Sequence, residues 1–222
     1  GSANGDIWVI KFKGWSWKAQ ELNMDVTSVR FSHGYDSDKA ILAIASDTDT
    51  SYLCLGYRII SDNTTEWVGE PIEIIDLRET NSGDSPTKSE IIISDLVLPS
   101  ADYSTGEGWA AYAGYYSTAA ANVDDVYRIE DSGDVLRLKV KGGSEVSITS
   151  IAYNNGKLLA GGMTNIAGTA EALIRICANP EDDFQKWGKP TKPPTGGVIS
   201  GCANAQVAWS SDGEMAYCGT ST

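Results

Sequence analysis

The chain has 222 residues, a formal net charge of −13 and a pI near 4.4. Such an acidic surface repels phosphate backbones and anionic headgroups, so we expect no binding to nucleic acid or anionic membranes. No apolar run approaches the roughly 20 residues of a membrane span, so we expect no membrane insertion. The opening GSANGDIWV lacks the basic and apolar regions of a signal peptide, so we expect none in this sequence.

Short apolar runs separated by polar turns predict β-hairpins from the start of the chain. Residues 8–20, WVIKFKGWSWKAQ, predict a first pair of strands. Residues 25–46 predict a strand, a turn within FSHGYDSDK and a strand of small apolar residues. Residues 55–69, LGYRIISDNTTEWVG, predict the next hairpin. No segment keeps apolar residues at helical spacing over three turns, so we expect no helices.

The same elements return in the second half of the chain. Residues 90–117 and 146–164 each predict an apolar strand, a polar connection and a strand rich in Ala, Gly and Ser. Hairpins follow them at 126–140, VYRIEDSGDVLRLKV, and at 172–188, ALIRICANPEDDFQKWG. Residues 204–221 predict one more strand pair of the first kind. The chain therefore alternates two kinds of strand pair.

This alternation is an internal repeat. A basic residue recurs just before the turn of the hairpins, at Lys11, Arg58, Arg128 and Arg175, with steps of 47, 70 and 47 residues. The unit contains four strands in roughly 50 to 65 residues, near the range of known repeat periods. The strands that precede the hairpins align at the following residues: Val29, Leu96, Ile151 and Val207.

Four short antiparallel strands per unit are typical of a β-propeller blade, so we predict an all-β propeller or propeller fragment spanning 1–222. One such sheet cannot bury both faces alone, and radial stacking solves that problem. The chain opens on the second strand pair and closes on the first. The two ends either pair and close a ring of four blades, or the chain belongs to a longer propeller. The predicted segments are a half-blade at 1–24, blades at 25–75, 89–141 and 145–195, and a half-blade at 199–222.

The stretch RIEDSGDVL resembles the Asp-box, S/T-x-D-x-G-x-x-W, of sialidase-like (BNR) and sortilin-like propellers. Asp131, Gly133 and Leu136 occupy the Asp, Gly and aromatic positions. Ile129 departs from the pattern, because that family has Ser or Thr there. The chain is also similar to surface-layer-like bacterial propellers, in which such boxes are structural.

The residues of these boxes are expected to stabilise the fold. An Asp in a tight turn accepts backbone N–H groups, and a Gly supplies a positive φ, so we expect these roles for Asp131 and Gly133. Trp67 and Trp187 keep the aromatic position in two other hairpins, and we expect them to lie between blades.

Catalytic residues are not expected. The single histidine, His33, lies in a predicted turn, which disfavours a Ser-His-Asp triad. The resemblance to sialidases implies an arginine triad, but the arginines stand at equivalent positions of different blades, so we expect them to be structural. Paired acids are expected to be solvated turn residues: Asp36 and Asp38, Asp47 and Asp49, Asp124 and Asp125, and Glu181 to Asp183.

Two binding functions are open. Asp47 and Asp49 in SDTDTS place oxygen side chains at alternate positions, as calcium ligands do, so they are candidates for Ca²⁺; no other cofactor is expected. Trp109, Tyr112 and Tyr115 are candidates for stacking on a sugar or contacting a protein, and the alternative for them is packing in the core.

The four cysteines are widely spaced and form no C-x-x-C motif, so a zinc site is not expected. Three of them lie in apolar runs, where a free Cys is usually a small buried hydrophobe. A single disulfide that includes Cys202 is the alternative. The cysteines are Cys54, Cys177, Cys202 and Cys218.

The resemblance implies a non-catalytic propeller module outside the cytoplasm, secreted or at the cell surface. It would act as a scaffold or as a protein- or glycan-binding surface. Two alternatives stay open: a fragment of an Asp-box glycoside hydrolase, and a self-assembling structural protein of the cell surface.

Overall fold

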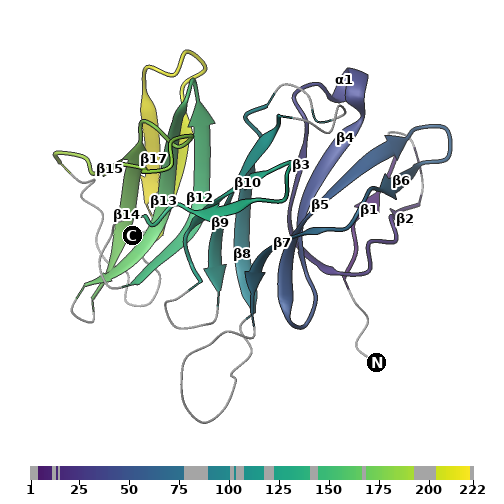
Figure 1. Ribbon diagram of the computed structural model, residues 1–222, viewed down its shortest axis with the longest axis horizontal. Helices are drawn as coiled ribbons and strands as arrows, with labels where there is room; N and C mark the ends of the chain where they lie inside the picture. The colour runs from purple at the N-terminus through teal and green to yellow at the C-terminus, as the bar shows by residue number, and fades with distance from the viewer. Residues whose placement is uncertain are drawn as a thin grey trace, which may run out of the picture.

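The computed structural model shows an all-β chain, as predicted (Figure 1). Every strand pair in the described residues is antiparallel. No helix among these residues is long and apolar enough to span a membrane. The structure describes residues 5–11, 14, 16–77, 90–100, 103, 108–117, 123–140, 145–166, 169–192 and 204–220.

The strands form three larger sheets and two ribbons. Sheet I contains β3 (Asp25–Phe31), β4 (Ala40–Ser46), β5 (Thr50–Ile59), β6 (Thr64–Trp67) and β7 (Ile72–Asp76). Sheet II contains β8 (Ile91–Val97), β9 (Ala110–Ser117), β10 (Val126–Glu130) and β11 (Val135–Arg137). Sheet III contains β12 (Glu145–Asn154), β13 (Lys157–Ile166), β14 (Thr169–Cys177) and β15 (Trp187–Gly188). The N-terminal ribbon is β1 (Trp8–Val9) with β2 (Lys18–Ala19), and the C-terminal ribbon is β16 (Ala205–Trp209) with β17 (Ala216–Thr220).

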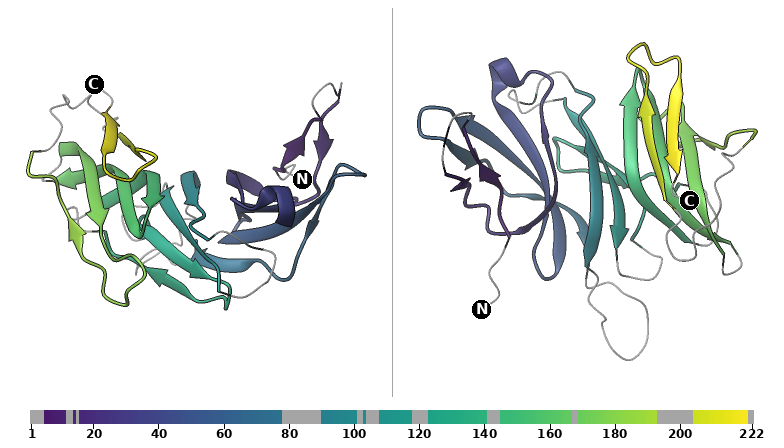
Figure 2. Two further views of the ribbon diagram at one scale, coloured as in Figure 1. Left: turned by 90° about the horizontal axis from the view of Figure 1, so that it is seen from above. Right: turned by 180° about the vertical axis from the view of Figure 1, so that it is seen from behind.

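The sheets follow one another in chain order along an open arc, with the two ribbons at its ends (Figure 2). The first strands of successive units, β3, β8, β12 and β16, lie next to each other in that order. The two ribbons are separate two-stranded sheets within the described residues and do not close a ring. Of the two alternatives left open by the sequence, the one in which the chain ends pair is not seen in the described residues. The four-stranded antiparallel sheets are confirmed.

Apolar residues fill the spaces between the sheets. One cluster joins sheet I to sheet II and includes Leu42, Ile44, Leu96 and Tyr115. A second joins sheet II to sheet III, and a third lies between sheet I and the segment of the N-terminal ribbon. Because the strands of sheet I carry apolar side chains on both faces, the sheet needs a neighbour on each side. Each buried Leu or Ile adds about 1.5 to 3 kcal/mol to stability.

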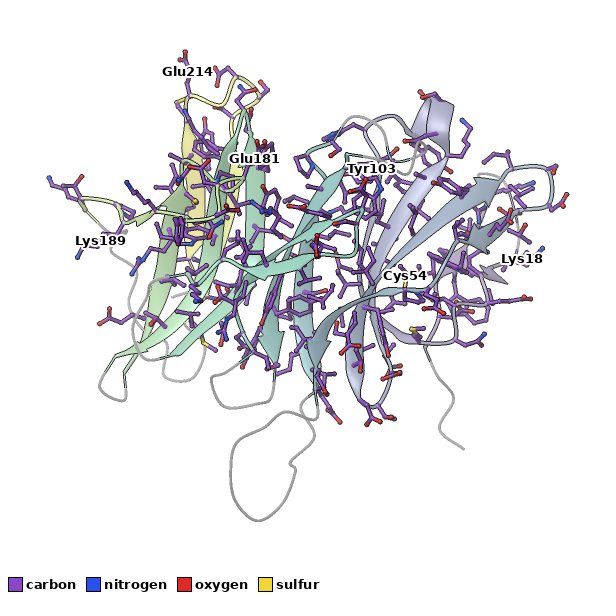
Figure 3. All side chains as sticks on the ribbon, viewed as in Figure 1. Lys18, Cys54, Tyr103, Glu181, Lys189 and Glu214 are labelled. Carbon is purple, nitrogen blue, oxygen red and sulfur yellow. The ribbon has the colours of Figure 1, made fainter. Side chains whose placement is uncertain are left out.

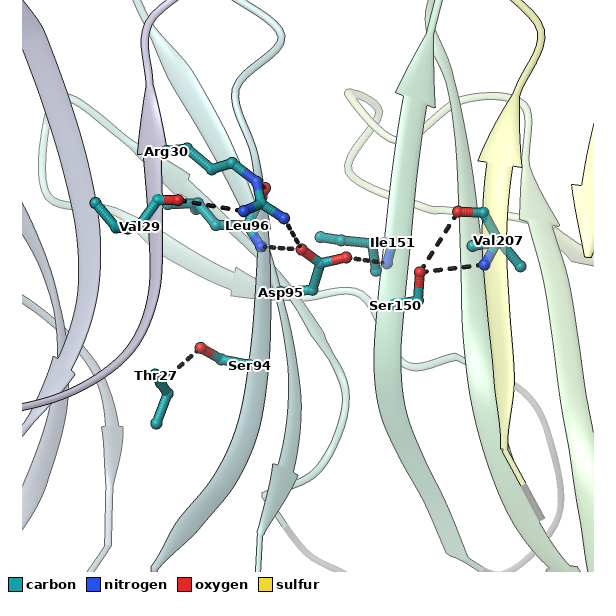
Figure 4. Close-up of polar contacts among 9 residues, drawn as sticks. All are labelled: Thr27, Val29, Arg30, Ser94, Asp95, Leu96, Ser150, Ile151 and Val207. Atoms are coloured by element: carbon teal, nitrogen blue, oxygen red, sulfur yellow. Dashed lines mark hydrogen bonds and ion pairs between the residues drawn. The ribbon is translucent and has the colours of Figure 1, made fainter. Parts of the chain in front are cut away.

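Polar contacts repeat between the first strands (Figure 4). Asp95 Oδ2 in sheet II accepts the N–H of Ile151 in sheet III at 2.8 Å. Ser150 Oγ, at the aligned position of sheet III, accepts the N–H of Val207 in the C-terminal ribbon at 3.1 Å. These two junctions therefore share one contact, made from aligned positions of the repeat.

The second strands need small residues at these junctions. A Cβ on Gly114 of β9 would lie 2.6 Å from Ile148 Cγ2 in the next sheet. A Cβ on Gly161 of β13 would lie 2.5 Å from the carbonyl oxygen of Ala205. Real Cβ contacts are longer than this, so each sheet can approach its neighbour because a glycine faces it.

The tryptophans of the outer strands bridge sheets. Trp67 Nε1 donates to the carbonyl of Gln20, next to the N-terminal ribbon, at 2.9 Å. Trp187 Nε1 in sheet III donates to the carbonyl of Leu138, just after sheet II, at 2.9 Å. Each acceptor directly follows the outer strand of the preceding unit, so the indole contact repeats along the chain as the inner contacts do.

Two details of sheet I differ from the prediction. A four-residue helix, α1 (Tyr35–Asp38), stands in the predicted turn before β4, so the expectation of no helices is wrong. The carboxylate of Asp38 accepts hydrogen bonds from Ser32 Oγ and the N–H of Ala40, which closes this turn tightly. Sheet I also has a fifth strand. β5 is ten residues long, and β6 and β7 pair with its opposite halves.

Candidate functional site

A pocket of about 350 Å³ opens between sheets II and III. Residues 99, 100, 108 and 109 between β8 and β9 line one side, residues 130 and 131 at the turn after β10 a second, and Tyr153 and Glu181 a third. Three aromatic and four charged side chains lie in this lining. The lining residues are Pro99, Ser100, Gly108, Trp109, Ala110, Tyr112, Arg128, Glu130, Asp131, Tyr153 and Glu181.

Strand geometry brings the aromatic residues together. Trp109 directly precedes β9, and Tyr112 lies within it. The rings of Tyr112 and Tyr153 stack across the two sheets, with centroids 5.8 Å apart and an interplanar angle of 17°. The ring of Trp109 packs with its centroid 5.5 Å from that of Tyr103, which is labelled in Figure 3. Two of the three aromatic candidates from the sequence thus line one pocket.

The third candidate, Tyr115, lies elsewhere. Its side chain is fully buried between sheets I and II, where its hydroxyl bonds with Ser51 Oγ at 3.2 Å. Burial raises the pKa of this phenol far above its ordinary value. Tyr115 is therefore a core residue.

Two buried polar atoms of the pocket lining lack hydrogen-bond partners: the hydroxyl of Tyr112 and Nε of Arg128. The Nε atom lies 2.9 Å from Glu130 Oε1, so the two groups form an ion pair without hydrogen-bond geometry. Buried polar groups are normally satisfied, and each exception calls for an explanation. Only one other such atom, Ser46 Oγ, occurs among the described side chains.

Arg128 is held from sheet III. Its Nη1 atom donates to the carbonyls of Pro180 at 3.2 Å and Glu181 at 2.5 Å. These carbonyls lie between β14 and β15, so the guanidinium of sheet II is clamped by the next sheet. The side chain of Glu181, which is labelled in Figure 3, accepts a hydrogen bond from the hydroxyl of Tyr153 at 2.9 Å.

The lining carries three acids and one base, which makes the pocket acidic. Burial raises the pKa of the Tyr112 phenol well above its ordinary value, so the group stays protonated. Burial also raises the pKa of Tyr153, and its hydrogen bond to Glu181 raises it further. The pocket therefore offers phenol and guanidinium donors, carboxylate acceptors and aromatic surface.

The turn between β10 and β11 borders the pocket. The carboxylate of Asp131 accepts a hydrogen bond from the N–H of Gly108. The backbone N–H of Asp131 donates to the carbonyl of Trp109 at 3.2 Å. Gly133 has a φ of 87°, which a side-chain-bearing residue rarely adopts. The turn thus holds the start of β9, and with it Trp109, in place.

A second, smaller pocket of about 200 Å³ contains His33. Arg30, Phe31 and residues 96–98 line it together with Tyr153, which borders both pockets.

The candidate calcium ligands close the turn between β4 and β5. Asp47 Oδ1 accepts the N–H groups of Asp49 and Thr50 at 2.7 and 2.8 Å. No three His, Cys, Asp or Glu side chains of the described residues gather as a metal site would require. The geometry seen at Asp47 is that of a turn residue.

The other sequence candidates lie apart from the pocket. Arg58 is buried in sheet I and donates to Asn63 Oδ1 at 2.8 Å. Cys54 and Cys177 are buried free thiols, and Cys218 is an exposed one. Cys202 lies outside the described residues.

Two acids differ from the expectation of solvated turns. Asp124 and Asp125 are each 2% exposed. Asp125 pairs with Arg137 Nε at 2.7 Å, and Asp124 accepts bonds from Ser117 and Ser147. Their position between two strands gave no sign in the sequence that this connection folds inward.

Comparisons with known proteins add no assignment, because no family model, curated protein or solved structure matches this chain. The Asp-box resemblance stays a prediction, and function has to be argued from the pocket.

Proposed function

We propose that this chain is a non-catalytic β-propeller-type module that binds a neutral saccharide in the pocket between sheets II and III. Stacked four-stranded sheets along an arc support the propeller arrangement. The pocket supports the binding role. A location outside the cytoplasm is part of the same proposal, by the resemblance described above.

One observation carries the ligand class. The hydroxyl of Tyr112 is buried in the pocket lining without a hydrogen-bond partner, whereas Nε of Arg128 is ion-paired with Glu130 Oε1 at 2.9 Å. A ligand oxygen that reaches the Tyr112 hydroxyl would accept its hydrogen, because a protonated phenol can donate. The ligand therefore has at least one acceptor oxygen.

The acidic residues of the lining limit the chemical class of the ligand further. Glu130, Asp131 and Glu181 repel an anionic ligand and accept hydrogen bonds from a donor. A simple cation would satisfy the acids but has no oxygen to accept the hydrogen of the Tyr112 hydroxyl. A polyol both donates and accepts through each hydroxyl, and its C–H faces pack on aromatic rings, so a neutral sugar fits the whole lining.

The experiment is a binding screen of the intact chain against an array of neutral saccharides, with sialylated and amino sugars as charged comparisons. Affinities of the hits are then measured by calorimetry. We expect binding to neutral sugars. Binding to none of them, or binding only to the charged ones, would contradict the assignment.

Tyr112→Phe tests the site itself. The change keeps the ring and removes a hydroxyl that bonds to nothing in the fold, so stability should stay equal or rise. Affinity should fall by about 2- to 13-fold, which corresponds to one neutral hydrogen bond of about 0.5 to 1.5 kcal/mol.

Tyr115→Phe is the matched control. It removes an equally buried hydroxyl that does bond, to Ser51, and that lies outside the pocket. This variant should lose stability and keep its affinity. The opposite pattern in the two variants would place the site elsewhere.

A further inference from the structure

The two ribbons are complementary halves of one sheet. The N-terminal ribbon precedes sheet I and ends where Trp67 reaches the carbonyl of Gln20, so β1 and β2 correspond to the third and fourth strands of a unit. In the C-terminal ribbon, β16 packs on β12 and β13 of sheet III and corresponds to a first strand. Within the described residues, β17 pairs only with β16, and β1 only with β2.

The aligned residues on the first strands of the sheets differ in how far they are covered by a neighbouring sheet. Leu96, Ile151 and Val207 occupy the aligned position in sheet II, sheet III and the C-terminal ribbon, and are 0, 4 and 9% exposed. Gly114 and Gly161, on the second strands of the preceding sheets, would carry a Cβ within 3.0 Å of Ile151 and 2.8 Å of Val207. Val29 is the aligned residue of sheet I and is 39% exposed. No second strand of the described residues covers it.

The C-terminal ribbon has a face of the kind that covers a first strand in the other sheets. Gly219 of β17 pairs with Gln206, and Gly161 of β13 pairs with Ser150 at the aligned position. A Cβ on Gly219 would meet no atom within 4 Å, in contrast to Gly161. Its strand neighbour Tyr217 is 55% exposed. This face is shaped to receive a first strand, and no described part of the chain reaches it.

The ribbons differ in their charged residues. The segment of the N-terminal ribbon carries exposed Lys11 and Lys18 beside the acids Asp6 and Glu21. The C-terminal ribbon carries exposed Asp212 and Glu214 and no basic residue. The two lysines are therefore the groups of the N-terminal ribbon that can pair with the acids of the C-terminal one.

We propose that a second copy of this chain joins these surfaces. The C-terminal ribbon of one copy lies against sheet I of the other, β17 pairs with β1, and Gly219 faces Val29. The result is a composite four-stranded sheet like sheets I to III. The ribbons stand at opposite ends of the arc of one copy, so the partner ribbon comes from another copy (Figure 2).

The same contact made twice closes a ring. Each of two copies contributes its three complete sheets, and each composite sheet takes one ribbon from each copy, which makes eight sheets. Propellers typically have about four to eight blades, so a ring of this size is an accepted architecture. Closure leaves no ribbon edge open, which removes the hazard of unpaired strand edges.

Sedimentation velocity and light scattering of the intact chain test the proposal. One copy has a mass of 23.7 kDa, and we expect a species of twice that mass. A monomer at tens of micromolar protein would overturn the proposal, as would larger assemblies that persist in the interface variant described next.

Gly219→Leu should convert the dimer to a monomer. It adds bulk where a single copy has open space, so the fold should remain, as circular dichroism would show. Gly188→Leu is the control: this exposed glycine of β15 has only ordinary contacts at its Cβ, and the dimer should persist. A dimer that survives Gly219→Leu would refute the contact.

A second variant reports the contact directly. In Val29→Cys/Gly219→Cys, oxidation should link two copies, so that a band of twice the mass appears on a non-reducing gel. Each single variant is its control, because Cys218 is already exposed on β17. Equal cross-linking in single and double variants would place the interface elsewhere.

Discussion

The stability of this protein should depend on the ionisation of Asp124. Its carboxyl is 2% exposed between β9 and β10. Oδ1 accepts the N–H of Ser117 at 2.9 Å and its hydroxyl at 2.6 Å, and Oδ2 accepts the hydroxyl of Ser147 at 2.8 Å. Burial raises the pKa from its ordinary 3.8 to about 6, although these hydrogen bonds and nearby Arg137 act in the opposite direction.

The raised pKa determines the direction in which folding stability changes with pH. Below pH 3.8 the carboxyl is protonated in both the folded and the unfolded state, and its contribution to stability is fully present. Between pH 3.8 and 6 the unfolded chain releases the proton while the folded chain retains it, so stability falls. A shift of about two units corresponds to about 3 kcal/mol, at 1.36 kcal/mol per unit.

Urea unfolding at pH 4 and pH 7.5 measures this effect in the protein and in Asp124→Asn. The amide cannot ionise and still offers one oxygen to Ser117. From pH 4 to pH 7.5, Asp124→Asn should gain about 2 kcal/mol relative to the unaltered protein, because part of the window lies below pH 4.

Glu66→Gln is the control, because it removes one exposed carboxyl from β6 without touching the buried group. It should follow the unaltered protein at both pH values. If Asp124→Asn and the unaltered protein changed equally with pH, the buried carboxyl would not be the titrating group.

Four further changes are each measured by urea unfolding. Gly161→Ala should cost about 1 to 3 kcal/mol through overpacking, whereas Gly188→Ala, at an exposed glycine with ordinary contacts, should change stability by less than about 0.5 kcal/mol; equal effects would show that the close approach is unimportant. Trp187→Phe should cost about 0.5 to 1.5 kcal/mol, because the bond to the preceding sheet is lost; an unchanged midpoint would argue against it. Asp95→Ala should cost about 1 to 3 kcal/mol, because the N–H of Ile151 loses its acceptor, and hydrogen exchange at Ile151 should quicken.

Local chemistry explains how far the sequence predicts this fold. Asn155-Gly156 is a turn in which both residues need positive φ, and the structure has 47° and 74° there, between β12 and β13. Alternating apolar residues on both sides of such a turn indicate two strands that pair with each other directly. The helix α1 was missed because four residues are too few to show an apolar period. Its backbone bonds, from the N–H of Asp38 to Gly34 and from that of Lys39 to Tyr35, are supported by the bond of Ser32 Oγ to the Asp38 carboxylate.

The pocket depends on contacts that no local pattern contains. Trp109 and Tyr112 stand out as an aromatic run, and both line it. Tyr153 and Glu181 come from the next sheet, and nothing near either residue indicates that they meet Tyr112 and Arg128. Burial of Asp124 likewise depends on Ser147, which lies across the junction in β12.

The pocket is not a general product of the repeat, which is the strongest physical reason to assign it a role. In sheet III the first two strands are joined by the tight turn at Asn155-Gly156, whereas in sheet II the same connection runs from 98 to 109. Within that longer connection, Tyr103 is fully buried against sheet I, and its hydroxyl bonds to the carbonyl of Ala110. Tyr103 thereby fills the junction of sheets I and II, and Pro99, Ser100, Gly108 and Trp109 line the pocket at the next one. Connections on a rigid scaffold are where binding sites usually lie, and this one borders an acidic, aromatic cavity in which the Tyr112 hydroxyl has no hydrogen-bond partner.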